Sequence, residues 1–199
     1  MRMLTDFSEI LGQAIRQTTF VVVDVETTGL SPREGGITEI AMIKVRNGML
    51  WDEFSTLVDP LMPIPYDITA LTGIDDEMVA HAPTAQEVAA PISQFLGDGV
   101  FTAHNAHFDL GFVNSTLAKG KLEAIQNPVL CTCKLARRLL PNLQSKSLGP
   151  VTKQLGISNL QRHRAAGDAY ATAQVLIRFL DRLEEEFEVT DVRGLMKFQ

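Results

Sequence analysis

The alternation of apolar and polar positions predicts that the first part of the chain forms strands that fold back on one another. Residues 19–25 are an apolar, β-branched run typical of a buried strand. Residues 37–46 alternate loosely and end at Asn47-Gly48, a dipeptide that favours a two-residue hairpin turn. Residues 49–58 are then expected to return as the next strand. We expect the first of these three strands to lie centrally, because both of its faces are apolar.

Helical spacing of apolar residues appears before the first strand and again in the second half of the chain. Residues 3–15 have this spacing. Two further strands are expected at 99–104 and 128–131. The other expected helices are Ala85–Leu96, Phe108–Lys119, Leu135–Leu140, Leu148–Leu155 and a long one beginning near Ala165. The apolar stripe of the last helix consists of Ala169, Ala173, Leu176, Leu180, Leu183 and Phe187.

This order of elements predicts an α/β fold with a mixed central sheet, in which a three-strand meander is followed by parallel strands and flanked by helices. The length of 199 residues and the hydrophobic content of 45% fit one domain with a sizeable core. We expect that core at about residues 18–185. An extra helix at about 3–16 precedes it, and a short C-terminal extension could pack back or bind a partner.

The N-terminal region and the cysteines bear on the cellular location of the protein. The longest apolar run in the first 30 residues is Phe20–Val23, which is too short for a signal peptide or a membrane span. We therefore expect a soluble, cytoplasmic protein that does not associate with a membrane. Cys131 and Cys133 are badly spaced for a mutual disulfide and are expected to be buried, reduced thiols.

The charge of the chain is unevenly distributed. A formal net charge of −6 argues against a nucleic-acid-binding protein. However, Ala124–Gly167 contains no Asp or Glu and carries a charge of +7, which leaves −13 on the rest of the chain. Such a segment could form a positive surface for phosphates, and solvated helix faces are the alternative. Its basic residues are Lys134, Arg137, Arg138, Lys146, Lys153, Arg162 and Arg164.

Two acids, Asp24 and Glu26, follow the apolar run of the first strand. Because strand side chains alternate, both point to one face, whereas Val23 and Val25 point to the other. Two like charges on a buried strand repel each other and lose hydration, a cost that a cation between them would offset. Hard divalent ions such as Mg²⁺ and Mn²⁺ prefer oxygen ligands. An acid pair of this kind also arises where any strand leaves the core.

Two more acids fall at the expected starts of helices. Asp109 and Asp168 could each simply stabilise a helix N-terminus. Together with Asp24 and Glu26, however, they occupy strand ends and helix starts, where α/β folds form their binding crevice. His163 precedes Asp168 by five residues. The set could supply ligands for two metal ions and a base that titrates near neutrality.

Three ordered motifs carry a family resemblance. They are "DVETTGL" from Asp24, "AHNAHFDLGFV" at 103–113 and "HRAAGDAYAT" from His163. The chain resembles the DnaQ-like 3'–5' exonucleases that use four acids and one histidine, often called DEDDh. The resemblance covers about residues 18–185. It implies an RNase H-like fold and hydrolysis of a nucleic acid from its 3' end, which releases 5'-mononucleotides.

The resemblance also implies a role for each of the five catalytic residues. Asp24 would bridge two divalent cations, Mg²⁺ or Mn²⁺. Glu26 and Asp168 would complete the first metal site, and Asp109 would hold the second, partly through water. His163 would take the proton from the attacking water. This agrees with the chemistry, because one metal lowers the pKa of water and the other stabilises the leaving oxygen.

Four residues are implied as contacts of the terminal nucleotide. The backbone at Thr27 and Thr28 would approach it, and Leu30 would wedge against its base. Phe108 would pack near the sugar or the next base, a contact that tolerates any sequence. Ordinary core packing is the alternative for Phe108.

Three further residues are implied to belong to the substrate-binding site. His104 and Asn105 would brace the second motif. Thr72 stands where the bacterial proofreading subunit has a histidine and other branches of the family have threonine. The predicted activity does not depend on this difference, but the presence of threonine leaves the subfamily undecided.

The substrate and partners remain to be chosen among alternatives. The motifs are closer to polymerase-associated proofreading exonucleases than to oligoribonuclease. A nucleic acid with a free 3' end, preferably single-stranded DNA, is therefore the first choice, and RNA trimming is the second. A different class is a binding subunit of a DNA polymerase or repair complex. Residues 174–179 loosely match a sliding-clamp peptide, but their place in a helix favours core packing.

Overall fold

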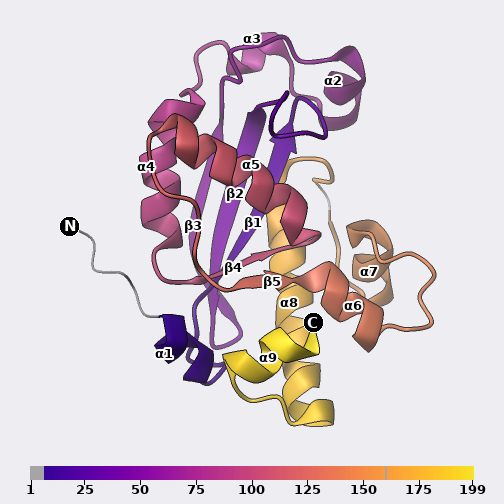
Figure 1. The fold of residues 1–199 in the computed structure, drawn as a ribbon. Coiled ribbons are helices and arrows are strands. Elements are labelled where there is room, and N and C mark those ends of the chain that lie inside the picture. The colour runs from indigo at the N-terminus through magenta and orange to yellow at the C-terminus, as the bar shows by residue number, and fades with distance from the viewer. Residues whose placement is uncertain (1–6, 160) are drawn as a thin grey trace.

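A five-stranded sheet with the order β3-β2-β1-β4-β5 forms the centre of the protein (Figure 1). The computed structural model describes residues 7–159 and 161–199. The strands are β1 (Phe20–Thr27), β2 (Ile37–Arg46), β3 (Met49–Leu57), β4 (Val100–Ala103) and β5 (Val129–Cys131). β1, β2 and β3 pair antiparallel, and β4 and β5 join them in parallel. The predicted mixed sheet and the central place of its first strand are confirmed.

Helices cover the sheet and both of its ends. They are α1 (Phe7–Gly12), α2 (Tyr66–Thr72), α3 (Asp76–Val79), α4 (Ala85–Leu96), α5 (Ala106–Lys119), α6 (Thr132–Leu139), α7 (Leu148–Gln154), α8 (Ala165–Phe187) and α9 (Val192–Phe198). No helix among the described residues is long and apolar enough to cross a membrane.

The N-terminal helix ends earlier than the predicted range of residues 3–15. α1 ends at Gly12, and Ala14 instead forms an isolated bridge with Asp191. Ile15 is buried, but it lies in the turn beyond the helix. Residues 3–6 of the predicted helix lie outside the described residues. The apolar spacing of 3–15 therefore combines a short helix with a turn that packs against the C-terminal region.

The alternation along β1 divides the core into two layers. Val21, Val23 and Val25 pack on the side of α4 and α5, and Phe20 and Val22 pack on the side of α8. Figure 1 shows α5 crossing in front of the sheet, α4 at its left side and α8 behind it. The even-numbered positions of β1 therefore face α8, and this face continues to the acids at the end of the strand.

The C-terminal segment packs back onto the domain. Most of the predicted stripe of α8 is buried, but Phe187 is 44% exposed and packs edge-on against Phe198. The helix leaves the sheet before Phe187, so α9 covers that position instead. Val175, Leu176 and Phe179 are buried, which confirms core packing for residues 174–179.

The thiols and the last residue lie beside the edge strand β5. Cys131 and Cys133 are free, as predicted. Only Cys131 is buried; Cys133 is half-buried, because it stands in the first turn of α6 near the surface. The side chain of Gln199 accepts a hydrogen bond from the Cys131 N–H (2.9 Å) and donates one to the Val129 carbonyl (2.9 Å). The C-terminus thus satisfies backbone groups at the edge of the sheet.

Candidate active site

Three carboxylates meet where the end of β1 approaches the start of α8. Asp24 and Glu26 lie two residues apart on β1, and Asp168 lies in the first turn of α8. One carboxylate oxygen from each lies within 4.8 Å of the others. All three residues are half-buried. An all-oxygen donor set of this kind fits a hard divalent cation such as Mg²⁺ or Mn²⁺.

The fourth acid, Asp109, reaches the same edge of the sheet from the other layer. It lies in the first turn of α5, which follows β4, the parallel neighbour of β1. Asp109 is only 4% exposed. Burial raises the pKa of Asp109 to about 7, although hydrogen bonds from its own backbone N–H and that of Val25 favour the charged form. The contact with Val25 places this carboxylate against the acid-bearing end of β1.

The local electrostatics disfavour negative charge at the centre of the cluster. Loss of hydration on burial is the main cause that raises the pKa of Asp24 well above its ordinary value. Neighbouring carboxylates raise the pKa of Asp24 further, in the order Asp109, Asp168, Glu26 and Glu39. Burial also raises the pKa of Glu26 to about 7, with Asp168 and Glu39 adding to the effect. A bound cation would relieve both the repulsion and the lost hydration.

His163 lies in the loop that enters α8. Its backbone has φ +61°, a left-handed conformation that residues other than glycine seldom adopt. Its backbone N–H donates to one carboxylate oxygen of Asp168 (3.0 Å), and the Asn159 side-chain amide donates to the other. The loop therefore orients Asp168, and the backbone of His163 contacts this acid directly. The His163 side chain is half-buried.

One buried acid at the site, Glu39, was not predicted from the sequence. It lies on β2 directly opposite Glu26 and is 4% exposed. Its carboxylate accepts hydrogen bonds from the Arg164 guanidinium and from the Ala165 backbone N–H. Two signals could have found it, namely an acid within the predicted strand 37–46 and a base directly after His163.

The predicted nucleotide contacts at the end of β1 and in the loop after it differ in how exposed their side chains are. The Thr27 hydroxyl donates to the Gly29 carbonyl (2.7 Å), and the Thr28 hydroxyl accepts from the Gly36 N–H (3.0 Å). Both threonines are buried, so their side chains shape the loop. Leu30, by contrast, is 88% exposed.

Thr72 has a structural task at the end of α2. It is buried, and its hydroxyl donates to the Ile68 carbonyl (3.0 Å) and accepts from the Ile74 N–H (3.1 Å). These bonds satisfy backbone groups where the helix ends at Thr72, directly before Gly73, which has φ +73°. The hydroxyl of Thr72 is therefore engaged within the protein.

The second motif links three segments of the chain. The His104 Nε2–H donates to the Lys146 carbonyl (2.7 Å), and Nδ1 lies 2.9 Å from the Thr132 hydroxyl. Burial lowers the pKa of His104, which fits a neutral ring between these partners. Asn105 is exposed with φ +74° at the start of α5, and Phe108 is half-buried with its ring centroid 5.0 Å from that of Phe112.

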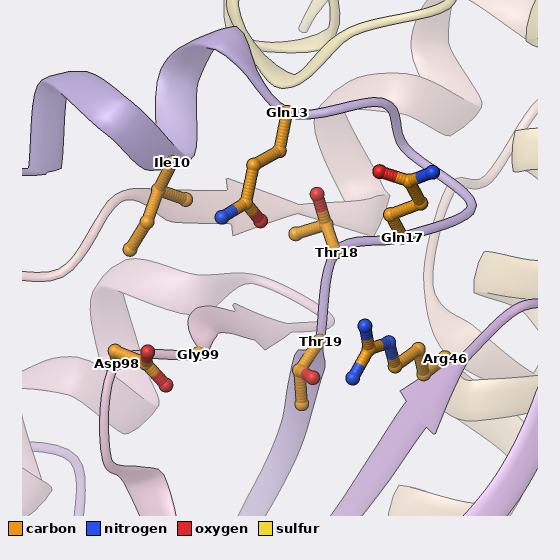
Figure 2. Close-up of a pocket in the computed structure, with 8 residues that line it drawn as sticks. All are labelled: Ile10, Gln13, Gln17, Thr18, Thr19, Arg46, Asp98 and Gly99. Atoms are coloured by element: carbon orange, nitrogen blue, oxygen red, sulfur yellow. The ribbon is translucent and has the colours of Figure 1, made fainter.

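A separate hollow of about 320 Å³ lies at the opposite end of β1 (Figure 2). It contains no predicted site residue, and several of its side chains are exposed and polar. The predicted acids Asp24 and Glu26 lie at the other, C-terminal end of β1. The hollow is lined by Ile10, Gln13, Gln17, Thr18, Thr19, Arg46, Asp98 and Gly99.

The family model described as exonuclease (RNase T) matches residues 21–176, a range that includes all five predicted catalytic residues. The chain belongs to this exonuclease family. Its domain is DnaQ-like, and the enzyme class is a phosphodiester hydrolase. The resemblance inferred from the three motifs is thereby confirmed.

Relatives in sequence include much longer proteins. The PolC-type DNA polymerase III of Clostridium perfringens is 45% identical over 177 residues, which cover 88% of this chain and 12% of that protein. The corresponding protein of Bacillus cereus is 40% identical over 178 residues, covering 89% of this chain and 12% of that protein. The chain thus spans about an eighth of the length of these relatives and is homologous to their exonuclease domain.

Solved structures confirm the RNase H-like fold. Exonuclease X in complex with 5' overhanging duplex DNA superposes with a TM-score of 0.71 and 32% identity, covering 89% of this chain and 99% of that one. Exonuclease I of E. coli in complex with a dT13 oligonucleotide gives a TM-score of 0.77, covering 86% of this chain and 43% of that one. The latter is 18% identical and supports the fold alone.

Proposed function

We propose that this exonuclease is metal-dependent and removes 5'-mononucleotides from the free 3' end of DNA. The observation that carries the proposal is the cluster of Asp24, Glu26 and Asp168, whose carboxylate oxygens lie within 4.8 Å of one another. The base nearest to them in the chain, Arg164, is paired with Glu39. A divalent cation would supply the positive charge that the cluster lacks.

The donor set supports Mg²⁺ or Mn²⁺ in two sites. Asp24, Glu26 and Asp168 are proposed to hold one ion, and Asp24 with Asp109 to hold the other. When bound, such a pair lowers the pKa of an attacking water and stabilises charge on the leaving 3' oxygen. The four carboxylates supply only oxygen ligands, which hard cations prefer over zinc-type sulfur and nitrogen sites.

The protein's own groups orient the site and move the proton. Asp168 is fixed by hydrogen bonds from the His163 N–H and from Asn159. An imidazole can accept a proton near neutral pH, and we assign that role to His163. His104 is proposed to brace the second motif through its bonds to Thr132 and Lys146. The exposed Leu30 and the half-buried Phe108 are proposed to contact the terminal bases.

A basic hollow supports a path for the phosphates of the strand. Lys153 and Arg162 line an open hollow of about 670 Å³ beside α7, and Arg162 directly precedes His163 in the chain. Both side chains are exposed. Single-stranded DNA is favoured as substrate because relatives of this fold were solved with single-stranded oligonucleotides and with overhanging duplex DNA. Electrostatic contact with phosphates needs no particular base sequence.

Digestion of a 5'-labelled single-stranded DNA tests the function. We expect a ladder that shortens from the 3' end with Mg²⁺ or Mn²⁺ and disappears with EDTA. His163→Ala is expected to reduce the rate by ~10²–10⁴-fold, the usual range for loss of a general base. Asp24→Ala should abolish the ladder. Faster digestion of a matched RNA would assign the chain to RNA trimming, and no ladder on either substrate would favour a polymerase-associated binding role.

A further inference from the structure

Glu39 adds a carboxylate to a site that already has too much negative charge. It is buried on β2, and its charge raises the pKa values of both Asp24 and Glu26. Burial of a charge is unfavourable unless close partners compensate it. The reason for its presence must therefore lie in the groups that it binds.

The partners of Glu39 belong to the segment that starts α8. Arg164 donates from Nη2 to Oε1 (2.7 Å) and from Nε to Oε2 (3.1 Å), and the Ala165 N–H donates to Oε2 (2.8 Å). The two-pronged guanidinium contact fixes orientation as well as distance. The Ala165 N–H is one of the donors at a helix start that no helical carbonyl reaches. Glu39, which lies on β2, thus caps the N-terminus of helix α8.

The contact between Glu39 and Arg164 lies next to two residues of the proposed mechanism, His163 and Asp168. His163 directly precedes Arg164 and has a left-handed backbone, which persists only where surrounding contacts enforce it. The Asp168 N–H donates to the Arg164 carbonyl (3.0 Å), and the His163 N–H donates to the Asp168 carboxylate (3.0 Å). The backbone of Arg164 is therefore joined to His163 by the peptide bond and to Asp168 by a hydrogen bond. Its side chain is bonded to Glu39 on β2.

We propose that Glu39 and Arg164 form a positioning clamp that holds His163 against the acidic cluster for proton transfer. The inference rests on the proposed function. The guanidinium binds Glu39 and acts on the reaction through the backbone of His163. Release of the clamp lets the loop leave its left-handed conformation, which lowers the rate of the chemical step while DNA binding persists.

Three substitutions and one matched control test the clamp. Arg164→Met removes the charge and both bonds, Arg164→Lys keeps the charge without the fork, and Glu39→Gln keeps the shape of the acceptor. Arg16→Met is the control, because Arg16 also ties a loop to α8, through Asp181 and Glu184 at the far end of the helix. All are assayed on 5'-labelled single-stranded DNA with saturating Mn²⁺.

The clamp predicts a loss in kcat rather than in KM. Arg164→Met should lower kcat about 10–100-fold, the size usual for residues that orient metal and proton-transfer groups, with KM changed less than about twofold. Arg164→Lys and Glu39→Gln should retain more activity than Arg164→Met. Arg16→Met should lower the Tm but leave kcat at the wild-type value. If Arg164→Met does not fold, the kcat values of Arg164→Lys and Glu39→Gln decide whether the proposal holds.

A double-mutant cycle shows whether the clamp acts through His163. In a His163→Ala background, Arg164→Met should cost less than about twofold, because the group that it positions is gone. Wild-type kcat in the folded clamp variants would overturn the proposal, as would an equal loss in both backgrounds. An inactive wild-type protein would instead overturn the proposed function, so the two failures are distinguishable.

Discussion

At the scale of single residues, Asp24 combines an electrostatic penalty from burial and from four neighbouring carboxylates with a place among the proposed metal ligands. Its carboxylate is destabilised by burial and by the acids around it. Asp24→Asn should therefore raise the Tm of the metal-free protein at pH 8 by several degrees and abolish nuclease activity, as expected where function and stability oppose each other.

The matched control is Asp67→Asn, which alters an exposed acid on α2. It should leave both the Tm and the nuclease rate unchanged. Thermal melting in EDTA and ladder assays in Mg²⁺ measure the two effects. A lower Tm for Asp24→Asn in EDTA would show that this carboxylate stabilises the metal-free fold and contradict the electrostatic account.

The raised pKa values of Glu26 and Asp109 predict how stability depends on pH. Both titrate at about 7, above the ordinary values of 4.5 and 3.8, so the native state binds these protons more tightly than the unfolded state does. Their contribution is full below about pH 4 and is lost as the pH rises through about 7. The Tm in EDTA should therefore fall between pH 5 and pH 8 on account of these groups.

Metal should reverse this trend, because a cation competes with the protons for the same oxygens. Ions at ~100 times their Kd contribute about 2.7 kcal/mol, or ~5–10 °C in Tm for a chain of this size. The increase should be larger at pH 8 than at pH 5. Equal increases at both pH values would mean that the ions bind elsewhere.

The sequence predicts some site residues much better than others. Asp24, Glu26, Asp109, His163 and Asp168 fall in short motifs, so their type and spacing are readable locally. The bond between Glu39 and Arg164 joins residues 125 positions apart, and no local pattern encodes it. Thr28 and Thr72 show the reverse, since the family resemblance placed them at the substrate, whereas their hydroxyls bond to backbone groups of the fold.

At the scale of elements, the close packing of the His163 loop against α8 depends on Gly167. A Cβ at this position would lie 2.3 Å from the Gln161 carbonyl oxygen, a backbone atom that cannot simply rotate away. Gly167→Ala should therefore displace the loop that carries His163. We expect lower kcat and lower Tm, measured by ladder assay and thermal melting.

Gly111→Ala is the matched control within α5. A Cβ there meets only Pro32 at 3.4 Å, an ordinary contact. The substitution should keep activity and stabilise the helix by about 0.5–1 kcal/mol. Wild-type activity in Gly167→Ala would show that the loop can shift without moving the histidine.

The elements that could be predicted are those whose apolar residues alternate, form a short run or follow helical spacing. All five strands and α4 to α8 follow from alternation or helical spacing, apart from shifts at their ends. α2 and α3 were missed because the prolines and turn residues around them indicate a loop. α9 is held by tertiary contacts such as that between Phe187 and Phe198. A periodic pattern in the sequence does not predict such contacts.

At the scale of the whole molecule, a net charge of −6 coexists with a segment that carries +7. The acids at the cluster would repel a phosphate backbone unless cations and nearby bases compensate. Lys153 and Arg162 line the basic hollow beside α7, so they are the bases expected to attract the strand. Their effect should appear as salt dependence of binding.

Neutralising these two bases should flatten that salt dependence. With Lys153→Gln and Arg162→Gln together, the slope of log K against log salt should fall by about 1.4, since each phosphate contact of a single strand contributes about 0.7. Fluorescence anisotropy with labelled single-stranded DNA in Ca²⁺ measures the slope. Arg193→Gln with Lys197→Gln removes two exposed bases from α9 and should leave it unchanged. Equal slopes for the two double variants would place the strand on another face, because only charges that lie along its path release counterions when it binds.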